Sequence, residues 1–367
     1  MKNTLLILLL LIASTLQAQE TYLMWNDVDT QRFGKETIFK TDNKPLEGAY
    51  KIAENSGAYT QATFKNGKMV GTKKDFDFTG KLEQEITFNE NGQADGKSTS
   101  YYSNGKVYED FMYKNGLKEG EWKTYTNKGV LQKIESYSSD LKNGKWVAHL
   151  KDASTGTKLI ETSYYKDNEA TGKWNQKTED GRLIWEKNYS DAKDYSKKEY
   201  FSNGKLKSEE LYKDNKLDGI CTYYSSAGII LSEKKYEASY LKNLVNFYAN
   251  GTKKEVADSK DGHRHGPYQL YSEDGTLILE GQFTMGYKSG EWKSYTDDKM
   301  LKDMYTFEDS RKKGPAKTYN AAGKVESEGE YLNHVKTGLW KYYKLNGKVS
   351  KETEYKNGNV VSEKKYN

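Results

Sequence analysis

The chain has 367 residues, of which only 35% are apolar and 30% are charged. This composition is too hydrophilic for a thick two-layer core, yet 31 Tyr, 11 Phe and 7 Trp are too many for a disordered chain. The formal net charge is +5, with basic and acidic residues interleaved along the sequence. Counterion-release binding to nucleic acid needs clustered basic residues, so the composition argues against a nucleic-acid partner.

Residues 1–18 differ in kind from the rest of the chain. Lys2 is followed by an apolar run over residues 5–12 and then by small and polar residues that end at Ala18. This pattern predicts a secretory signal peptide that is cleaved after Ala18. The apolar run is about half as long as a membrane-spanning helix requires, and no second run follows it. We therefore expect the mature chain to be exported, either periplasmic or at the outer surface, without a transmembrane segment.

From residue 46 onward one pattern repeats, and it is clearest in the unit that begins at Gly120. With Gly120 as position zero, aromatic residues lie at +2 (Trp122), +5 (Tyr125) and +17 (Tyr137), and a second glycine lies at +9 (Gly129). The zero-position glycines are Gly48, Gly71, Gly96, Gly120, Gly144, Gly172, Gly219, Gly266, Gly290, Gly314 and Gly338, with Ser196 and Asn243 at the two remaining places. The chain therefore contains about 13 repeats of about 24 residues.

Each repeat is predicted to form two strands. Positions +1 to +6 combine aromatic and β-favouring residues with charges, and the second glycine marks the turn that follows. A second strand spans about +11 to +17, where alternation would place +11, +13, +15 and +17 on one face. Pairs such as Asn115-Gly116 then predict a tight turn. The predicted fold class is all-β, an elongated antiparallel β-hairpin array that forms a single-sheet ribbon or trough.

The repeat pattern divides the chain into four segments. Residues 1–18 form the signal peptide, residues 19–45 an N-terminal cap segment, residues 46–362 the repeat array and residues 363–367 a C-terminal tail. Repeat arrays need atypical ends, so we interpret residues 19–45 as a cover for the first exposed strand edge. A partner-binding arm is the alternative interpretation of this segment.

The repeated motifs resemble a known repeat family. Gly-Glu-Trp-Lys-x-Tyr at Gly120–Tyr125 and Gly290–Tyr295, with Tyr-Lys-Asn-Gly at Tyr113–Gly116, is similar to the bacterial variant of the MORN repeat. That variant is common in exported bacterial proteins and in YwqK-family antitoxin components. The resemblance covers residues 46–362 and implies a β-hairpin array for protein–protein or membrane-associated scaffolding, without catalytic residues. The antitoxin members imply a toxin as partner.

The sequence contains few candidates for chemistry. His263 and His265 share a face of an extended segment and, with Asp261, could chelate a divalent metal. A third strong ligand at fixed spacing is missing, so a solvated turn is the favoured interpretation and no metal or other cofactor is predicted. Cys221 occupies +2, the tryptophan position, and we interpret it as a buried small apolar residue and not as a nucleophile. No pair of carboxylates is set apart by an apolar neighbourhood, so we expect the protein not to be an enzyme.

The favoured function is a non-enzymatic exported scaffold that mediates protein–protein interaction at the cell envelope. The alternatives are a cell-envelope glycan-binding module and an antitoxin-like or immunity-like neutraliser of a partner toxin. The candidate binding residues are the aromatic rows Trp122, Tyr125, Trp146, Trp174, Trp292, Tyr295, Trp340 and Tyr343. Exposed rings in these rows would stack on sugars, whereas buried rings would leave the glycan alternative without a binding platform.

The aromatic rows are also expected to stabilise the array, which a pair of variants tests. Trp122→Ala combined with Trp146→Ala should destabilise the fold more than Lys123→Ala. Large-to-small changes of packed rings cost about 3–5 kcal/mol, and surface changes cost less than about 0.5 kcal/mol. The thermal unfolding midpoints of the two purified variants provide the measurement, and equal midpoints would contradict the structural role of the rings.

Overall fold

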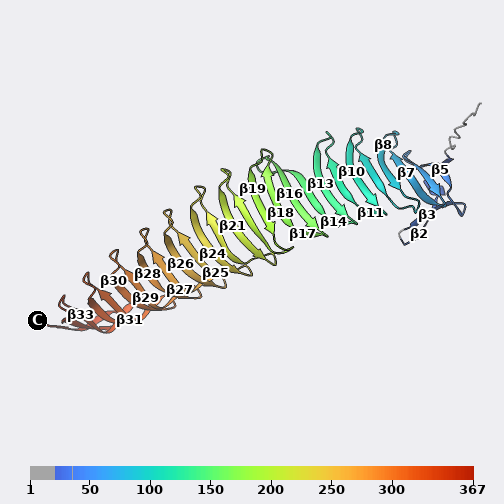
Figure 1. Cartoon of the computed structure of the whole chain (residues 1–367). Helices are drawn as coiled ribbons and strands as arrows, with labels where there is room; N and C mark the ends of the chain where they lie inside the picture. Colours follow the sequence, from blue (N-terminus) through green and yellow to red (C-terminus); the bar gives the residue numbers. More distant parts are fainter. Residues whose placement is uncertain (1–20, 35) are drawn as a thin grey trace, which may run out of the picture. The chain divides into compact units, whose positions relative to one another are not determined.

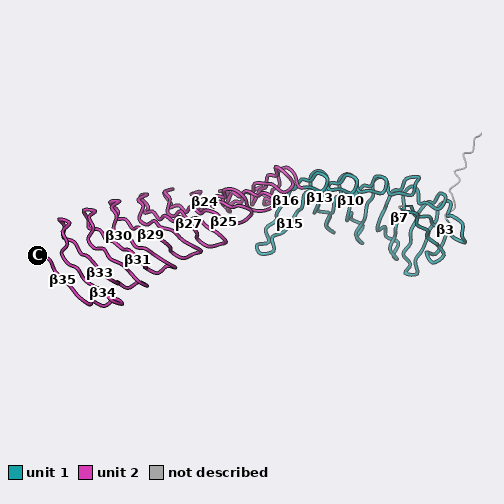
Figure 2. The backbone as a smooth tube through the Cα atoms, turned by 90° about the horizontal axis from the view of Figure 1, so that it is seen from below, with its two compact units in different colours: residues 1–169 teal, residues 170–367 magenta. Residues whose placement is uncertain are grey.

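The computed structural model describes residues 21–34 and 36–367 and divides into two compact units, residues 1–169 and residues 170–367 (Figure 2). Regular structure in the described residues is almost entirely strand. The exception is the three-residue 3-10 helix η1 (Trp25–Asp27), and no described helix is long and apolar enough to cross a membrane. The predicted signal peptide, residues 1–18, lies outside the described residues.

The first unit contains the strands up to β16. They are β1 (Thr21–Met24), β2 (Asp29–Phe33), β3 (Glu36–Thr41), β4 (Lys44–Pro45), β5 (Gly48–Ala53), β6 (Tyr59–Lys65), β7 (Lys68–Phe76), β8 (Leu82–Phe88), β9 (Gly96–Tyr101), β10 (Val107–Lys114), β11 (Leu117–Lys118), β12 (Gly120–Tyr125), β13 (Leu131–Ser138), β14 (Leu141–Lys142), β15 (Gly144–Lys151) and β16 (Lys158–Lys166). The short strand β17 (Glu169–Ala170) falls at the boundary between the units.

The second unit contains the strands from β18 onward. They are β18 (Gly172–Thr178), β19 (Leu183–Tyr189), β20 (Tyr195–Tyr200), β21 (Leu206–Lys213), β22 (Lys216–Leu217), β23 (Gly219–Tyr224), β24 (Ile230–Glu237), β25 (Tyr240–Phe247), β26 (Lys253–Lys260), β27 (His263–Tyr271), β28 (Leu277–Thr284), β29 (Tyr287–Tyr295), β30 (Leu301–Glu308), β31 (Arg311–Tyr319), β32 (Val325–Leu332), β33 (Val335–Tyr343), β34 (Val349–Lys356) and β35 (Asn359–Lys365).

Within each unit, consecutive strands of the repeats lie side by side in chain order and pair antiparallel (Figure 1). In the pair β12 and β13, Gly120 lies opposite Tyr137. The same pairing of position zero with +17 joins Gly338 to Tyr355 in β33 and β34. The predicted fold class, an all-β antiparallel hairpin array, is confirmed.

Backbone conformation explains why glycine recurs at fixed positions of the repeat. Gly120 and Gly129 have φ angles of 68° and 85°, a region that side chains with a Cβ rarely adopt. Lys299, which replaces the second glycine of one repeat, is held in the same region at 62°. In the turn between repeats, Asn115 and Gly116 have φ angles of 50° and 78°, as a two-residue hairpin turn with two positive φ angles requires.

A bulge in the second strand corrects the predicted face pattern. Thr124 pairs with Lys133, but the next residue, Tyr125, pairs with Leu131, so Gln132 at +12 is left without a partner in this ladder. Directly opposite residues share a face, and consecutive residues on the straight strand do not. Positions +11 and +13 therefore lie on opposite faces, and the prediction that +11 continues the row of +13, +15 and +17 is wrong.

Strand pairing shows that two repeats have their position zero one residue earlier than the sequence predicts. Tyr195, rather than Ser196, lies opposite Tyr212 at position +17. Asn243 pairs with Asp258 in the way that the +1 residue Glu121 pairs with Ser136. Asn243 is therefore at +1, and Lys242 is at position zero. Neither of the two corrected residues has a positive φ, so no glycine marks these origins in the sequence.

The N-terminal segment packs on the first repeats. β1 pairs in parallel with β5, and β2, β3 and β4 form a separate three-stranded sheet. Phe39 of β3 meets Phe64 edge-to-face with ring centroids 5.4 Å apart, and both Leu46 and Phe64 are only 1% exposed. This is the arrangement that an N-terminal cap over residues 19–45 requires, and the alternative of a partner-binding arm remains a hypothesis.

Strand structure continues beyond the expected end of the array at residue 362. β35 pairs antiparallel with β34 as far as Lys365, which lies opposite Lys351. The Tyr366 hydroxyl then donates a hydrogen bond to Glu352 at 2.6 Å. The segment 363–367 that the sequence assigns to a C-terminal tail is therefore largely part of the last hairpin.

Two tryptophans of the second unit pack directly on the backbone of glycines. Trp292 and Trp340 are 2% and 1% exposed. A Cβ on Gly281 would lie 2.3 Å from the Trp292 ring, and a Cβ on Gly329 would lie 2.4 Å from the Trp340 ring. Both glycines stand at +15 and have ordinary φ angles, so the ring, rather than the backbone conformation, requires glycine here.

A double-mutant cycle tests this contact. Gly329→Ala should destabilise the protein by about 1–3 kcal/mol because the added methyl group overpacks the ring. Trp340→Ala alone should cost about 3–5 kcal/mol. With Trp340 already replaced, Gly329→Ala should cost nothing or be slightly stabilising, since alanine lowers the entropy of the unfolded chain. Urea unfolding of the four proteins measures the coupling, and additive costs would show that the two residues do not interact.

Candidate functional site

The +2 tryptophans share a hydrogen bond to the preceding repeat. In four repeats the indole N–H donates to the backbone carbonyl ten residues earlier, in the pairs Trp122–Met112 (3.1 Å), Trp146–Ser136 (2.9 Å), Trp292–Gln282 (3.1 Å) and Trp340–Glu330 (3.1 Å). Trp174 instead donates to the carbonyl of Thr171 at 3.0 Å. A packed indole needs a partner for its N–H, and a backbone acceptor fixes the ring to the neighbouring strand.

A basic residue two positions before the zero glycine lies over these rings. The distances from Nζ to the ring centroid are 4.1 Å for Lys118 over Trp122, 4.4 Å for Lys142 over Trp146, 4.1 Å for Lys288 over Trp292 and 4.0 Å for Lys336 over Trp340. The same ammonium groups lie 4.8–5.4 Å from the +17 rings. Burial lowers the pKa of Lys288. Each contact contributes about 0.5–2 kcal/mol, and each covers ring surface that would otherwise be open.

The +2 and +17 rings alternate along the sheet. In the first unit Trp122, Tyr137, Trp146 and Tyr165 form an edge-to-face series with centroid separations of 5.7, 5.3 and 5.3 Å. The second unit has equivalent contacts at Phe283–Trp292 (5.1 Å), Trp292–Phe307 (6.2 Å) and Tyr331–Trp340 (5.2 Å). In these repeats the +2 and +17 rings are packing elements.

Two of the three candidate +5 tyrosines bind carboxylates of the preceding repeat. The Tyr295 hydroxyl donates to Glu280 at 2.6 Å, and the Tyr343 hydroxyl donates to Glu328 at 2.5 Å. Burial, with the hydrogen bond to Glu280, raises the pKa of Tyr295 to about 12. The hydrogen bond to Glu328 raises the pKa of Tyr343 to about 12 and, in return, lowers the pKa of Glu328. Tyr125 differs, because its backbone carbonyl accepts a hydrogen bond from the Tyr102 hydroxyl at 2.7 Å.

The candidate binding residues are divided between two faces of the sheet. Glu328 and Gly329 are consecutive in β32, so they face opposite sides. Trp340 packs on Gly329, and Tyr343 binds Glu328. The tryptophan row therefore lies on one face, which we call the ring face, and the +5 tyrosines lie on the other, which we call the tyrosine face. The eight candidate residues do not form one joint platform.

The histidine pair is not part of an assembled metal site. His263 and His265 both lie in β27, and His265 Nδ1 accepts a hydrogen bond from the Met285 backbone N–H at 3.3 Å. Within residues 21–34 and 36–367, no group of three or more His, Cys, Asp and Glu side chains is placed to hold a metal ion.

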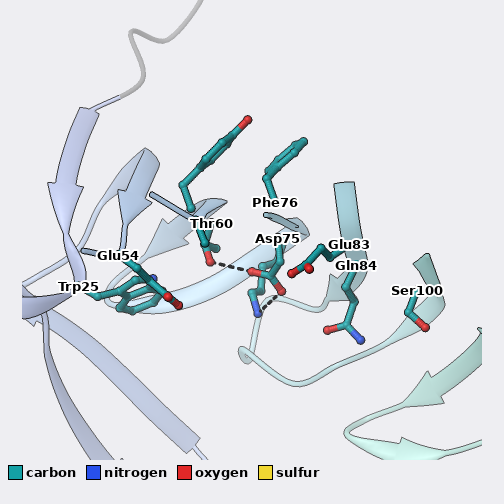
Figure 3. A pocket seen from close by; sticks show the side chains of 11 residues that line it. Trp25, Glu54, Thr60, Asp75, Phe76, Glu83, Gln84 and Ser100 are labelled. Atoms are coloured by element: carbon teal, nitrogen blue, oxygen red, sulfur yellow. Dashed lines mark hydrogen bonds and ion pairs between the residues drawn. The ribbon is translucent and has the colours of Figure 1, made fainter. Parts of the chain in front are cut away.

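A hollow of about 700 Å³ opens on the first unit (Figure 3). Its floor is a polar row on four adjacent strands, β6 to β9, in which Thr60 lies opposite Asp75, Asp75 opposite Gln84, and Gln84 opposite Ser100. Thr60 donates to Asp75 at 2.6 Å, and Lys73 forms an ion pair with the same carboxylate at 2.7 Å. The Ser100 hydroxyl is buried and has no hydrogen-bond partner in the described structure.

The sides of this hollow combine one aromatic ring with carboxylates. Trp25 and Glu54 stand on one side of the polar row in Figure 3, and Glu83 lies near Asp75 toward the other. Tyr59 and Phe76 stack with centroids 4.6 Å apart and planes inclined by 13°. They are the direct neighbours of Thr60 and Asp75 in β6 and β7, so their rings lie on the opposite face of the sheet from the polar row. The +2 residue of the repeat at Gly71 is Lys73 instead of tryptophan.

Sequence reasoning missed two features of this surface. The basic residues over the rings recur at one fixed position, −2, in Lys118, Lys142, Arg264, Lys288, Lys312 and Lys336, and that recurrence was a usable signal. The hollow had no such signal, because its floor depends on the register of four strands and its wall on the placement of η1.

The family comparison matches the repeats directly. The MORN repeat variant model matches residues 69–90, 94–115, 118–139, 196–214, 264–284, 312–333 and 336–357. No curated protein matches the chain.

Likeness to solved structures is weak. A structure titled TcdB2-TccC3-TEV is 11% identical, with a TM-score of 0.14, and the match covers 89% of this chain. This chain spans about a quarter of that structure's length, 26%. Choline binding protein F from Streptococcus pneumoniae, solved with a peptidoglycan analogue, is 12% identical, with a TM-score of 0.15 and coverage of 88% of this chain and 93% of that one. TM-scores this low carry no argument about fold or function.

The tyrosine–carboxylate contact predicts that the same substitution has different effects on stability at two tyrosines that both stand at +5. Tyr343→Phe should destabilise the protein by about 1–2 kcal/mol, because it removes a hydrogen bond to a charged acceptor. Tyr319→Phe is the matched control, since Tyr319 also stands at +5 but the preceding repeat has Met304 where an acceptor would be. Urea unfolding at pH 7 compares the two variants.

The raised tyrosine pKa fixes the sign of a pH effect. Because Tyr343 has a higher pKa in the folded protein, its stabilising contribution is complete below pH 10 and is lost as the pH rises toward 12. The stability gap between wild type and Tyr343→Phe should therefore narrow over that range. A gap that stays constant, or equal effects of the Tyr319 and Tyr343 changes, would contradict the assignment.

Proposed function

Because the chain is a MORN repeat variant protein, we propose that it is a non-enzymatic scaffold that binds a protein partner along its repeats. The match to the MORN repeat variant indicates a scaffold for protein or membrane interaction. The proposal selects a protein partner and places the contact at the cell envelope, since residues 1–18 predict export. Repeat arrays of this kind present the same groups at regular intervals, which suits an extended partner.

The observation that carries the proposal is the repeated charged surface of the tyrosine face. Positions +3 and +14 pair across strands on this face, with ion pairs at Lys74–Glu85 (3.1 Å), Lys198–Glu209 (3.0 Å) and Lys317–Glu328 (3.2 Å). The partners are about 30–45% exposed. Such exposed pairs add little to stability, about 0–1 kcal/mol each. They are, however, suited to select and orient a charge-complementary partner.

The ring face is the less suitable contact surface. Trp292 and Trp340 are buried, and lysine ammonium groups cover the rings of Trp122 and Trp146. A sugar needs an open ring face on which to stack, so the burial of these rings weakens the glycan-binding alternative. The antitoxin-like alternative differs only in the identity of the protein partner, and the test below decides it.

A charge-reversal experiment tests the proposal. The mature chain, immobilised and chemically crosslinked to an envelope fraction, should retain a specific protein whose crosslinks map to the tyrosine face. Lys317→Glu with Lys341→Glu should reduce this capture about tenfold or more, because like charges then meet. Lys324→Glu with Lys348→Glu is the control, since both lysines are exposed residues of the turns, outside the strand faces, and the net charge changes equally.

The possible results separate the alternatives. Capture that depends on the two tyrosine-face lysines supports the scaffold, and a captured partner with toxic activity would identify the neutraliser. Retention of polysaccharide alone, or capture that responds equally to both double variants, would overturn the proposed contact face.

A further inference from the structure

We infer that a row of lysines on the ring face of the second unit is a binding site for an acidic polysaccharide with one carboxylate per disaccharide. The row consists of Lys288, Lys312 and Lys336, which all stand at −2. Arg264, at −2 of the repeat before them, is excluded because it is paired with Glu255. The site lies on the opposite side of the sheet from the tyrosine face, so it goes beyond the protein contact proposed above and is independent of it.

The ammonium groups of this row are held at fixed positions. A lysine ammonium normally moves on a flexible four-carbon stem. Here each one lies over an aromatic ring, with Nζ 4.1, 3.2 and 4.0 Å from the ring centroid in the pairs Lys288–Trp292, Lys312–Tyr305 and Lys336–Trp340. Each cation–π contact stabilises this position by about 0.5–2 kcal/mol. The row therefore presents ordered charges, which lose little conformational entropy when a ligand binds.

The protein does not compensate these charges. In the described part of the chain none of the three lysines forms an ion pair, and their one side-chain hydrogen bond runs from Lys336 to the Tyr342 hydroxyl at 2.9 Å. Burial lowers the pKa of Lys288. Burial also lowers the pKa of Lys312, where Asp303 partly offsets the shift and the Lys288 charge adds to it. A bound anion would therefore offset both the poor hydration and the mutual repulsion of these ammonium groups.

The repeat fixes the interval between the charges. The three lysines lie on β29, β31 and β33, and each pairs with the +17 residue of the strand before it (Figure 1). Neighbouring strands are about 4.8 Å apart, so successive ammonium groups are about 9–10 Å apart. One disaccharide of an extended glycan has a similar length. A glycan with one carboxylate per disaccharide therefore places a negative charge beside each lysine.

Other polyanions fit this surface less well. An extended acidic peptide presents the side chains of one face about every 6–7 Å. A strand of duplex DNA presents a phosphate about every 3.4 Å along its axis. A membrane surface requires inserted apolar side chains besides charge, whereas Trp292 and Trp340 beneath the lysines are buried. A neutral glycan would need open rings for stacking, so charge and spacing together favour the acidic polysaccharide.

Glycan titration tests the site. A hyaluronan octasaccharide, which has one carboxylate in each disaccharide, should bind the mature chain in calorimetric titrations at low salt, and added salt should weaken the binding. Lys288→Met with Lys312→Met should weaken it about tenfold, because two ammonium groups are lost while methionine still covers the rings. Lys317→Met with Lys341→Met is the matched control on the tyrosine face of the same unit and should change the affinity less than about twofold.

Ligand controls keep the test decisive if a lysine variant is poorly folded. The carboxyl-reduced octasaccharide, which has the same length without the charges, should not bind to the wild-type chain. Tetraglutamate, with as many side-chain carboxylates, and phosphatidylglycerol vesicles should both compete only weakly. Absence of octasaccharide binding, equal binding of the reduced form, stronger binding of tetraglutamate or vesicles, or equal effects of the two double variants would each overturn the inference.

The outcome is separable from that of the proposed function. Octasaccharide binding that depends on Lys288 and Lys312, without any protein captured along the tyrosine face, would keep the polysaccharide site and refute the scaffold. Capture along the tyrosine face without octasaccharide binding would keep the scaffold and refute the polysaccharide site.

Discussion

The edge-to-face contact between the +2 and +17 rings is the interaction on which the repeats depend. It joins the first strand of one repeat to the second strands on both sides of it, as in Tyr137, Trp146 and Tyr165. The indole hydrogen bond to a backbone carbonyl fixes the ring, and the lysine at −2 covers it. Four weak contacts therefore meet at one ring and reinforce one another, which allows a chain with few aliphatic core residues to hold a single sheet together.

This arrangement places volume constraints on adjacent repeats. At two tryptophans, Trp292 and Trp340, position +15 of the preceding repeat is glycine, whereas at Trp122 it is Phe111, whose ring centroid lies 4.9 Å from that of the indole. Where +2 is small, as at Ala316, the residue opposite is Tyr305, at +15. Lys312, the −2 residue of that repeat, then lies 3.2 Å from the Tyr305 centroid instead of over a tryptophan. In this repeat the aromatic ring therefore stands on β30 instead of β31, and the Lys312 ammonium lies over that ring.

The features that depend on the backbone conformation of single residues could be predicted from the sequence, whereas those that depend on pairing between neighbouring strands could not. Gly120, Gly129 and the Asn115-Gly116 turn were identifiable because positive φ angles select glycine and asparagine. The bulge at Gln132 has no such marker, so the face of +11 was assigned wrongly. The origin at Tyr195 was missed for the same reason, since its φ angle does not require glycine. The basic residues at −2 were overlooked because lysine is common here, and a surface charge is its usual role.

The division of the two faces follows from the same ring contacts. Because the ring face is occupied by packing, the tyrosine face is left with exposed charge pairs that contribute little to stability and are free to vary. The first unit departs from this division where Lys73 and Ser98 replace tryptophan at +2. There the ring face lacks tryptophan, and the polar row from Thr60 to Ser100 forms the floor of the hollow. Other repeats also lack tryptophan at +2, as at Cys221 and Ala316, so the hollow is a property of the particular residues of these strands and not of the repeat as such.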